Sequence, residues 1–463
     1  MRARNEKAVD LKSTAGVEGL PDGWKATTLG QVVSLNYGKG LKQSNRCDGR
    51  VPVFGSNGVV GFHNCAMTNG PTIVIGRKGT VGAVHLSATP CWPIDTTYFI
   101  DQFDGVDPSF LTHLLRYLPL DSLDTSTTIP GLNRDDLYAQ EIALPTLAEQ
   151  RRIVEKVEAL LARVDAARAR LAAAPGILKW FRQAVLAAAC SGRLTADWRE
   201  TAGFNDGPAR DTTLQGEGAL PREWRCAAIS EIADVKTGAT PLRRRTDYYE
   251  GGTIPWVTSG AVNEPVISAA SEYITPLALK ETNAKLFPAG TLLIALYGEG
   301  RTRGMVSELG IEAATNQAVA AIIFHPAAAR SKRYIKLFLL DNYQRIRKLS
   351  AGGVQPNLSI GIICRTMIPL PPLAEQDEIV RRVESLFALA DRVEQRVAAA
   401  AARADRLTQA ILAKAFRGEL VGQEPAEEPA GVLGGRSMRQ RDRVVESVQH
   451  RKEPAGRHAS RFI

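Results

Sequence analysis

Two stretches of the chain carry the hydrophobic spacing of a long helix. Apolar residues recur at alternating spacings of four and three, which places them along one stripe, as in the a/d seam of a coiled coil. Two seams in one chain favour an antiparallel pair of helices, although each helix could instead pack on its own domain. The seam positions are Ile153, Val157, Leu160, Val164 and Leu171 in the first stretch, and Ile379, Val383, Leu386, Val393 and Val397 in the second.

The two stretches belong to an internal repeat. Residues 144–150, Leu-Pro-Thr-Leu-Ala-Glu-Gln, return as residues 370–376, Leu-Pro-Pro-Leu-Ala-Glu-Gln, and the offset holds without a gap for about fifty residues. Leu-Pro-x-x-Trp also occurs twice, at 20–24 and 220–224. A repeat of this length predicts two similar halves, each a globular block followed by a long helix. Within the first helix, Thr146 and Glu149 predict a capping box, and Pro175-Gly176 predicts a break or kink.

The globular blocks combine short apolar runs with many glycines. Residues 51–54 and 254–257, and residues 70–76 and 289–295, predict two pairs of matched strands. The predicted fold class is therefore α+β, with two mixed strand-rich domains separated by two long helices in an antiparallel coiled coil. The predicted segments are a flexible tail (1–19), the first block (20–146), a helical region (147–195), a linker (196–219), the second block (220–370), a second helical region (371–421) and a disordered basic tail (422–463).

Composition narrows the choice of partner. The 463 residues carry a net charge of +9, and 44% of them are hydrophobic. This balance is ordinary for a folded protein but favours a polyanionic partner, nucleic acid before membrane. No run of 18 apolar residues occurs, so we expect no membrane span. The six cysteines are scattered without a CxxC motif, which predicts a reduced, cytoplasmic location and no zinc site.

Sequence motifs of catalysis are missing. The chain has no GxxxxGK[ST] phosphate loop, no dinucleotide-binding fingerprint after a strand, no adenine-methyltransferase motif and no G-x-S-x-G nucleophile turn. The six histidines show no metal-ligand spacing. These patterns predict a binding protein that is not an enzyme and holds no metal.

Glycine-rich loops with cations are the candidate binding residues. Glycine lets a backbone approach phosphates closely, Arg and Lys neutralise them, and Arg, Asn and Gln can contact base edges. Any single cation is more simply a solvated surface charge, but the set favours nucleic acid. The candidates are Lys39, Lys42, Asn57, Arg77 and Lys78 in the first block, and Arg243, Arg244, Arg245, Arg301, Arg303, Gln355 and Asn357 in the second.

The doubled Leu-Pro-x-Leu-Ala-Glu-Gln with its heptad helix resembles the specificity subunits of type I restriction-modification systems. Residues 409–420, the opening Leu-Pro-x-x-Trp and residues 238–241 (Gly-Ala-Thr-Pro) are also similar to that family. The resemblance spans residues 20–421. The first copy departs from it at Cys190 and Ser191, where the second copy has Phe416 and Arg417.

The resemblance implies a DNA-binding subunit without catalysis of its own. Each block would be a target recognition domain for one half of a bipartite site in double-stranded DNA. The helices would hold the two domains apart and dock two methyltransferase subunits, and a translocase-nuclease would complete the restriction complex. S-adenosylmethionine, ATP and Mg would bind those partners, leaving no cofactor in this chain.

Three other functions stay open at this point. A specificity subunit of a related system with a different cutting partner would have the same sequence features. A coiled-coil adaptor without a DNA role predicts no salt-dependent affinity for DNA. A stand-alone nuclease would need a metal-binding carboxylate motif, which the sequence does not show.

Overall fold

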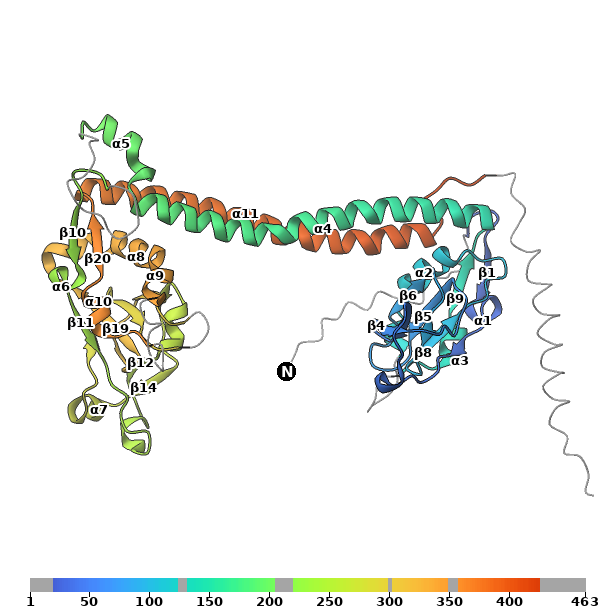
Figure 1. Cartoon of the computed structure of the whole chain (residues 1–463), viewed down its shortest axis with the longest axis horizontal. Coiled ribbons are helices and arrows are strands. Elements are labelled where there is room, and N and C mark those ends of the chain that lie inside the picture. The colour runs from blue at the N-terminus through green and yellow to red at the C-terminus, as the bar shows by residue number, and fades with distance from the viewer. Residues whose placement is uncertain (1–19, 124–130, 205–219, 299–301, 349–356, 425–463) are drawn as a thin grey trace, which may run out of the picture. The chain divides into compact units, whose positions relative to one another are not determined.

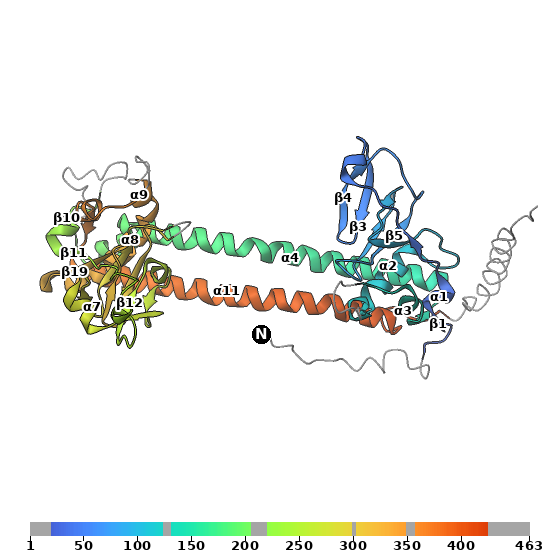
Figure 2. The same ribbon diagram turned by 90° about the horizontal axis from the view of Figure 1, so that it is seen from below.

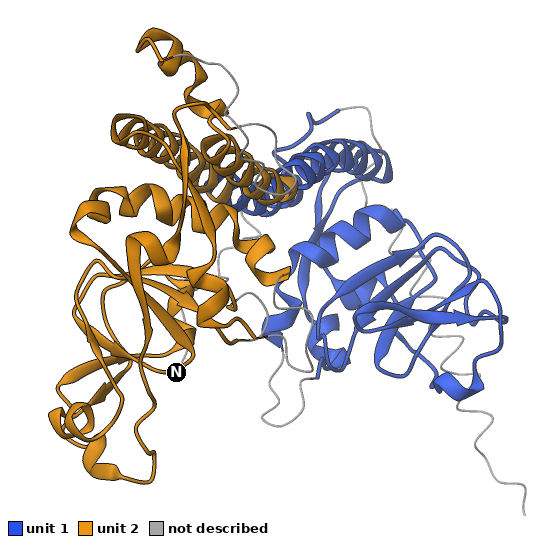
Figure 3. Cartoon of the chain, turned by 60° about the vertical axis from the view of Figure 1, so that its left-hand side comes forward, with its two compact units in different colours: residues 1–171, 399–463 blue, residues 172–398 orange. Residues whose placement is uncertain are grey.

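The computed structural model describes residues 20–123, 131–204, 220–298, 302–348 and 357–424. The chain forms two compact units, coloured blue and orange in Figure 3. Unit 1 comprises residues 1–171 and 399–463, and unit 2 comprises residues 172–398. Two helices of 44 residues, α4 (Leu147–Cys190) and α11 (Leu373–Phe416), each contribute to both units. Each unit therefore contains one block, the first part of the helix that follows it and the last part of the other helix.

The globular part of unit 1 contains three small sheets, with strand orders β1-β9, β2-β8-β5-β6 and β4-β3-β7 (Figure 1). Helix α2 packs on β5 and β6. The elements are β1 Lys25–Thr28, α1 Leu29–Val32, β2 Asn36–Tyr37, η2 Gln43–Asn45, β3 Val51–Gly55, β4 Gly58–His63, β5 Thr72–Gly76, β6 Val84–Ser87, β7 Trp92–Pro93, β8 Thr97–Ile100, α2 Pro108–Tyr117, η3 Leu120–Leu123, α3 Arg134–Tyr138 and β9 Glu141–Leu144.

Unit 2 repeats this plan with additional elements. Its sheets have the orders β10-β20, β11-β19-β16-β17-β13 and β14-β12-β18-β15. The elements are η4 Arg193–Thr195, α5 Ala196–Thr201, β10 Arg225–Ala228, α6 Ile229–Ile232, β11 Ala233–Thr237, η5 Thr246–Tyr248, β12 Ile254–Val257, η6 Ser259–Asn263, β13 Val266–Ile267, β14 Glu272–Ile274, α7 Pro276–Glu281, β15 Leu286–Phe287, β16 Leu292–Ala295, β17 Val306–Leu309, β18 Ala313–Thr315, β19 Val319–Phe324, η7 Pro326–Ser331, α8 Lys332–Asp341, α9 Tyr343–Lys348, α10 Ile360–Cys364 and β20 Met367–Leu370.

The matched strands expected from the sequence are present. Residues 51–54 and 254–257 lie in β3 and β12, each the strand between an antiparallel and a parallel neighbour in its sheet. The runs 70–76 and 289–295 contain β5 and β16, each paired antiparallel with two neighbours. The mixed α+β fold class is therefore confirmed.

The two repeated motifs meet in a buried hydrogen bond. In unit 1 the indole Nε1 of Trp24 donates to Glu149 Oε1 over 2.9 Å, and in unit 2 Trp224 Nε1 donates to Glu375 Oε2 over 2.8 Å. Both carboxylates are buried. The tryptophan that opens each block therefore fixes the first turn of the helix that follows. Thr146 Oγ1 accepts from the Glu149 N–H over 3.2 Å, as expected for the threonine of a capping box.

The end of each long helix belongs to the core of the block that it does not follow. Leu412, Ala415 and Phe416 are buried in the unit 1 core, and the Phe416 ring lies 5.5 Å from Phe110. The matching end of α4, with Cys190 at the position of Phe416, is buried in the unit 2 core. This packing explains why the repeat continues to the helix end.

The two helices run antiparallel within each unit. As predicted, residues further along one helix lie beside residues nearer the start of the other. Between the helices, the ion pairs Arg168–Asp405 in unit 1 and Arg182–Asp391 in unit 2 have this order. Arg152 of α4 also pairs with Glu424, which follows α11, and Arg382 of α11 pairs with Asp197, which follows α4.

The apolar seam is narrower than the sequence predicted. Ile153 and Ile379 lie in the cores of their own units, so both packing modes considered above occur. Further along, Leu160 and Leu386 at the other heptad position are half-buried, whereas Val393 is 37% exposed. The burial of Val393 was therefore predicted wrongly. Every seventh residue is buried or half-buried, at Val157, Val164, Leu171, Leu178 and Val185 on α4 and at Val383, Ala390, Val397 and Ala404 on α11.

The predicted break at Pro175-Gly176 is wrong. Helix α4 continues through Pro175 to Cys190. A proline inside a helix removes one backbone hydrogen bond. Pro175 and Gly176 are exposed, whereas Leu171 and Leu178 on either side keep the buried stripe in register.

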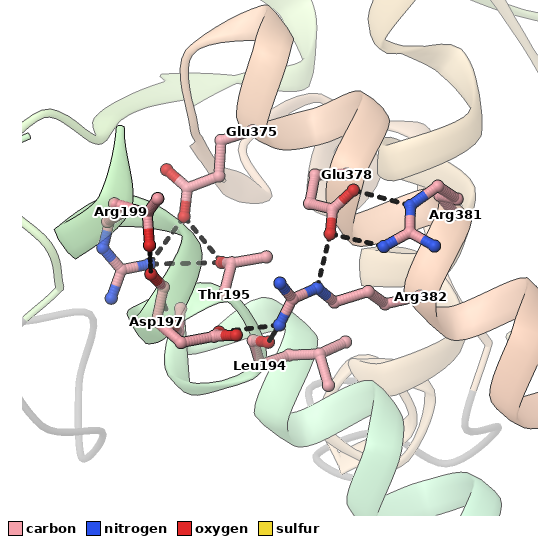
Figure 4. Close-up of polar contacts among 10 residues, drawn as sticks. Leu194, Thr195, Asp197, Arg199, Glu375, Glu378, Arg381 and Arg382 are labelled. Atoms are coloured by element: carbon pink, nitrogen blue, oxygen red, sulfur yellow. Dashed lines mark hydrogen bonds and ion pairs between the residues drawn. The ribbon is translucent and has the colours of Figure 1, made fainter. Parts of the chain in front are cut away.

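The predicted linker starts with ordered structure. Residues 196–201 form α5, and Arg199 is only 5% exposed. Arg199 Nη1 donates to Glu375 Oε1 over 2.6 Å, and Thr195 Oγ1 donates to the same oxygen over 2.7 Å (Figure 4). The segment after α4 is therefore anchored to the first turn of α11.

Candidate nucleic-acid interface

The candidate loops of the first block converge around one backbone carbonyl. Thr96 O accepts from the N–H groups of Arg77 and Lys78 and from Ser56 Oγ, at 2.9, 3.1 and 2.7 Å. These bonds bring the β5–β6 loop and the β3–β4 turn, where Asn57 lies, onto the turn before β8. The Lys39 N–H donates to Pro93 O over 3.0 Å, which adds the loop after β2. Segments separated in sequence thus form one loop face.

Aromatic rings hold the central arginine of this face. The Arg77 guanidinium carbon lies 5.2 Å from the Tyr37 ring centroid and 5.7 Å from that of Tyr98. Burial, the largest cause, and the neighbouring Tyr37 raise the pKa of Tyr98 to about 12. The Tyr98 hydroxyl is therefore protonated near neutral pH and donates to Leu132 O over 3.1 Å. Arg77 also donates through Nη2 to Asp95 O over 3.0 Å, so its position is fixed.

Unit 2 builds the matching face. The N–H of Leu296 donates to Ala318 O over 2.8 Å, and that of Leu358 donates to Leu296 O over 3.1 Å. These bonds join the β16–β17 loop, the turn before β19 and the segment before α10. The loop after β11 approaches the same turn at Gly238, where an added Cβ would lie 1.7 Å from Thr315 O. The equivalent Gly38 in unit 1 would place a Cβ 2.0 Å from Ile94 O. Only glycine permits this approach in both loops.

The three consecutive arginines in unit 2 have different surroundings. Arg243 Nη1 donates to Glu272 Oε2 over 2.6 Å, and its guanidinium carbon lies 4.9 Å from the Trp256 ring centroid. Arg245 pairs with Asp247 through Nε at 2.8 Å. Arg244 is exposed and, within the described residues, makes no ion pair or hydrogen bond. Arg244 therefore has its full charge available for an anionic ligand.

The other candidates differ in accessibility. Lys39, Lys42, Asn57, Lys78 and Asn357 are exposed. Arg303 is half-buried, and its carbonyl accepts from Arg347 Nη1 over 3.1 Å. Arg301 and Gln355 lie outside the described residues.

One further cation joins the unit 1 face without having been predicted. The Arg134 guanidinium carbon lies 5.5 Å from the Tyr37 ring centroid and 5.9 Å from that of Tyr138. The segment before it is bonded to the β5–β6 loop, because the Leu132 N–H donates to Arg77 O over 2.9 Å. The repeat was a signal for this segment, since residues 130–132 match residues 356–358, which include the candidate Asn357.

Within the described residues, titratable groups do not cluster as metal ligands. No group of three or more His, Cys, Asp or Glu side chains in the described part of the chain is placed to hold a metal ion. Among the same residues, no helix is long and apolar enough to cross a membrane.

Comparison with known proteins places both units in one family. The family model described as "Type I restriction modification DNA specificity domain" matches residues 21–173 and 221–400. The chain is 31% identical to the type I restriction enzyme EcoDI specificity subunit of Escherichia coli, over 96% of this chain and 98% of that protein. It is 30% identical to the EcoBI specificity subunit of the same species, over 96% of each chain.

Solved structures show the same fold. The HsdS subunit from Thermoanaerobacter tengcongensis matches with a TM-score of 0.55 and 21% identity, over 88% of this chain and 100% of that one. A chain from a study described as "Structural basis underlying complex assembly and conformational transition of the type I R-M system" matches with a TM-score of 0.64 and 21% identity, over 87% of this chain and 99% of that one. From the family match, which covers both repeated regions, and from the full-length relatives, we conclude that the chain belongs to the type I restriction-modification DNA specificity family.

Proposed function

We propose that this chain is the DNA-reading subunit of a type I restriction-modification complex, with one unit for each half of a bipartite double-stranded site. The observation that carries this proposal is the loop face, which is built twice on the same sheet plan. Glycine-rich loops with cations converge on it in both units, around Thr96 and around the turn before β19. Such a surface suits phosphate contact together with readout of base edges.

The two units are proposed to read different half-sites. Equivalent loops carry different side chains on a shared backbone plan: Lys39 and Lys42 follow β2, whereas Arg243, Arg244 and Arg245 follow β11. Direct readout depends on which donors and acceptors meet each base edge. Different side chains at matching positions therefore support different specificities.

The partners and cofactors are assigned by the same proposal. Two methyltransferase subunits and a translocase-nuclease complete the complex in the cytoplasm. S-adenosylmethionine, ATP and Mg belong to those subunits. The repeat supports two copies of the methyltransferase, because the chain carries two long helices that begin with the same Leu-Ala-Glu-Gln sequence.

The residues that dock a partner are proposed to face away from the helix pair. The predicted seam residues Ile153, Val157, Ile379 and Val383 are buried in the unit cores and cannot be the contact. Large apolar side chains elsewhere on the helices are exposed: Ile177 and Trp180 on α4 (63 and 72%), and Leu373, Leu389, Val393 and Leu407 on α11 (40, 46, 37 and 52%). Residues three or four apart, such as Ile177 and Trp180 or Leu389 and Val393, are neighbours on a helix surface, and exposed apolar neighbours mark an interaction site.

Replacing Trp180 with alanine is expected to weaken one of the two methyltransferase binding steps by about 30-fold, or about 2 kcal/mol. Only one step should change, because the repeat places Arg403 and Arg406 where Ile177 and Trp180 stand. Titration followed by light scattering measures the steps, with Lys179→Ala as a neighbouring exposed control. Two weakened steps, or none, would contradict the proposed contact, and so would a one-to-one complex of the wild-type chain at saturating partner.

Replacing Arg244 with alanine is expected to lower the slope of log affinity against log salt by about one, the value for a single phosphate contact. Arg243→Ala should lower the slope less, because Arg243 already neutralises Glu272. DNA binding by the purified chain at several salt concentrations measures both. Equal slopes for wild type and Arg244→Ala would place this arginine away from DNA, and a wild-type chain without salt-dependent affinity would favour the adaptor function.

A further inference from the structure

An exposed aromatic residue lies at the same register position in both units. In unit 1 the edge strand β4 places Phe62 opposite Pro52 of β3. In unit 2 the edge strand β14 places Tyr273 opposite Pro255 of β12. The two prolines belong to the matched strands of the repeat. The side chains of Phe62 and Tyr273 are 57% and 45% exposed, so each is only partly buried against its core.

The exposed apolar surface on β4 includes more than the Phe62 side chain. Val59 and Val60 precede Phe62 on this strand and are 51% and 44% exposed. An edge strand with exposed apolar side chains favours unwanted association, which proteins ordinarily prevent with charged side chains or proline on the strand itself. Here the strand is apolar and the aromatic position is kept in unit 2 despite little sequence similarity between the blocks. Both observations indicate a binding role.

Cations border the aromatic residue in each unit. Arg46 Nη1 donates to Val60 O over 2.8 Å, at the middle of β4. In unit 2, Arg243 lies at the aromatic strand and pairs with Glu272, the neighbour of Tyr273. Arg46 makes no ion pair within the described residues, so the unit 1 surface is complementary to a polyanion that also offers apolar groups. Double-stranded DNA does so, through its phosphates and the thymine methyl groups of the major groove.

The exposed apolar residues of β4 (Val59, Val60 and Phe62), here called the apolar strip, begin next to the loop face of unit 1. β4 begins directly after the turn that carries Asn57, and β3 and β4 form one hairpin (Figure 2). Ser56 in that turn donates to Thr96 O over 2.7 Å, the carbonyl around which the loop face is built. A duplex on the loop face is therefore next to the start of β4. In unit 1 this continuity favours DNA over a protein partner as the occupant, and Tyr273 takes the same register position in unit 2.

We propose that Phe62 and Tyr273 make apolar contacts with the bases, one in each half-site, and so contribute to sequence discrimination. The proposal rests on the proposed function and adds to it two residues that are not cations and lie outside the glycine-rich loops. Their contribution is to specific binding, because an uncharged aromatic ring neutralises no phosphate and leaves the counterion release unchanged.

The test uses Phe62→Ala and Tyr273→Ala in the full chain, with binding measured on the chain's own site and on unrelated DNA. The own site is read beforehand from DNA methylated by the wild-type complex. Each change is expected to lower affinity for the own site by about 10- to 100-fold. Affinity for unrelated DNA and the salt slope should stay at wild-type values. Phe62→Tyr should retain most of the specific affinity. Met67→Ala and Val266→Ala are the controls, since both residues are exposed and apolar but lie outside β4 and β14.

Three outcomes would overturn the proposal. Specific affinity unchanged in both alanine variants would exclude base contact. An equal loss of affinity for the own site and for unrelated DNA would mean that the residues act in folding or in contacts that do not depend on DNA sequence. Thermal unfolding of the variants separates these two explanations. Loss of methyltransferase binding with DNA affinity intact would make the strip a protein surface. Failure of the proposed function is recognised separately, because the wild-type chain would then bind no DNA.

Discussion

Replacing Glu375 with alanine is expected to destabilise unit 2 by about 3–5 kcal/mol, the cost of removing one partner of a buried ion pair. Glu375 is fully buried and accepts from Thr195, Arg199 and Trp224. Its removal leaves the Arg199 charge buried and the Trp224 N–H without its acceptor. The free energy of unfolding in denaturant, followed by tryptophan fluorescence, measures the effect.

Two further variants test whether the buried charge causes this loss of stability. Asp377 lies in the same turn of α11, but its ion pair with Arg330 is exposed, so Asp377→Ala should change stability by less than about 0.5 kcal/mol. The double change of Glu375→Gln with Arg199→Met removes the buried charge together with its partner, and should recover much of the loss. Equal effects of Glu375→Ala and Asp377→Ala would show that the buried network does not anchor α5 and α11.

The Glu375 network also shows what the sequence could and could not predict. The doubled Leu-Pro-x-x-Trp and Leu-Ala-Glu-Gln motifs established the repeat, but not that Trp224 and Glu375 bond across 151 positions. Arg199 lay in a segment rich in glycine and polar residues, which resembles a linker. Its burial depends on a partner far along the chain, and local composition carries no signal for that.

Periodicity predicted the helices better than their surroundings. The spacing of Ile153 and Val157 identified a helix, and the repeat identified its counterpart. Periodicity did not show that these residues pack on a block while Val393 is 37% exposed. A seam pattern reports which residues share a face, but the partner of that face is set by tertiary packing.

The loop face was predicted as a set of residues, without its geometry. Glycine and cations marked Arg77 and Arg243, but their environments were not evident. Arg77 lies over two tyrosine rings and Arg243 pairs with Glu272. Arg134 was missed because no glycine-rich loop surrounds it. These differences arise from contacts between distant segments, which a single sequence does not display.

Exchange of the first block is expected to change one half of the recognised DNA sequence completely. Residues 20–146 contain β1 through β9, so a block from another family member brings both strands of the β1–β9 pair with it. The junction leaves Glu149 on α4 to bond the incoming tryptophan of Leu-Pro-x-x-Trp. Because unit 2 keeps its own loop face, its half-site should remain the same. The reciprocal exchange of residues 220–370 should change only the other half.

Sequencing of methylated sites in DNA modified by the exchanged complex tests the division of labour between the two units most directly. The expected result is a bipartite site in which one half has new bases and the other half is identical to that of the wild-type complex. A site changed in both halves, or in neither half while the complex stays active, would contradict the assignment of one half-site to each unit.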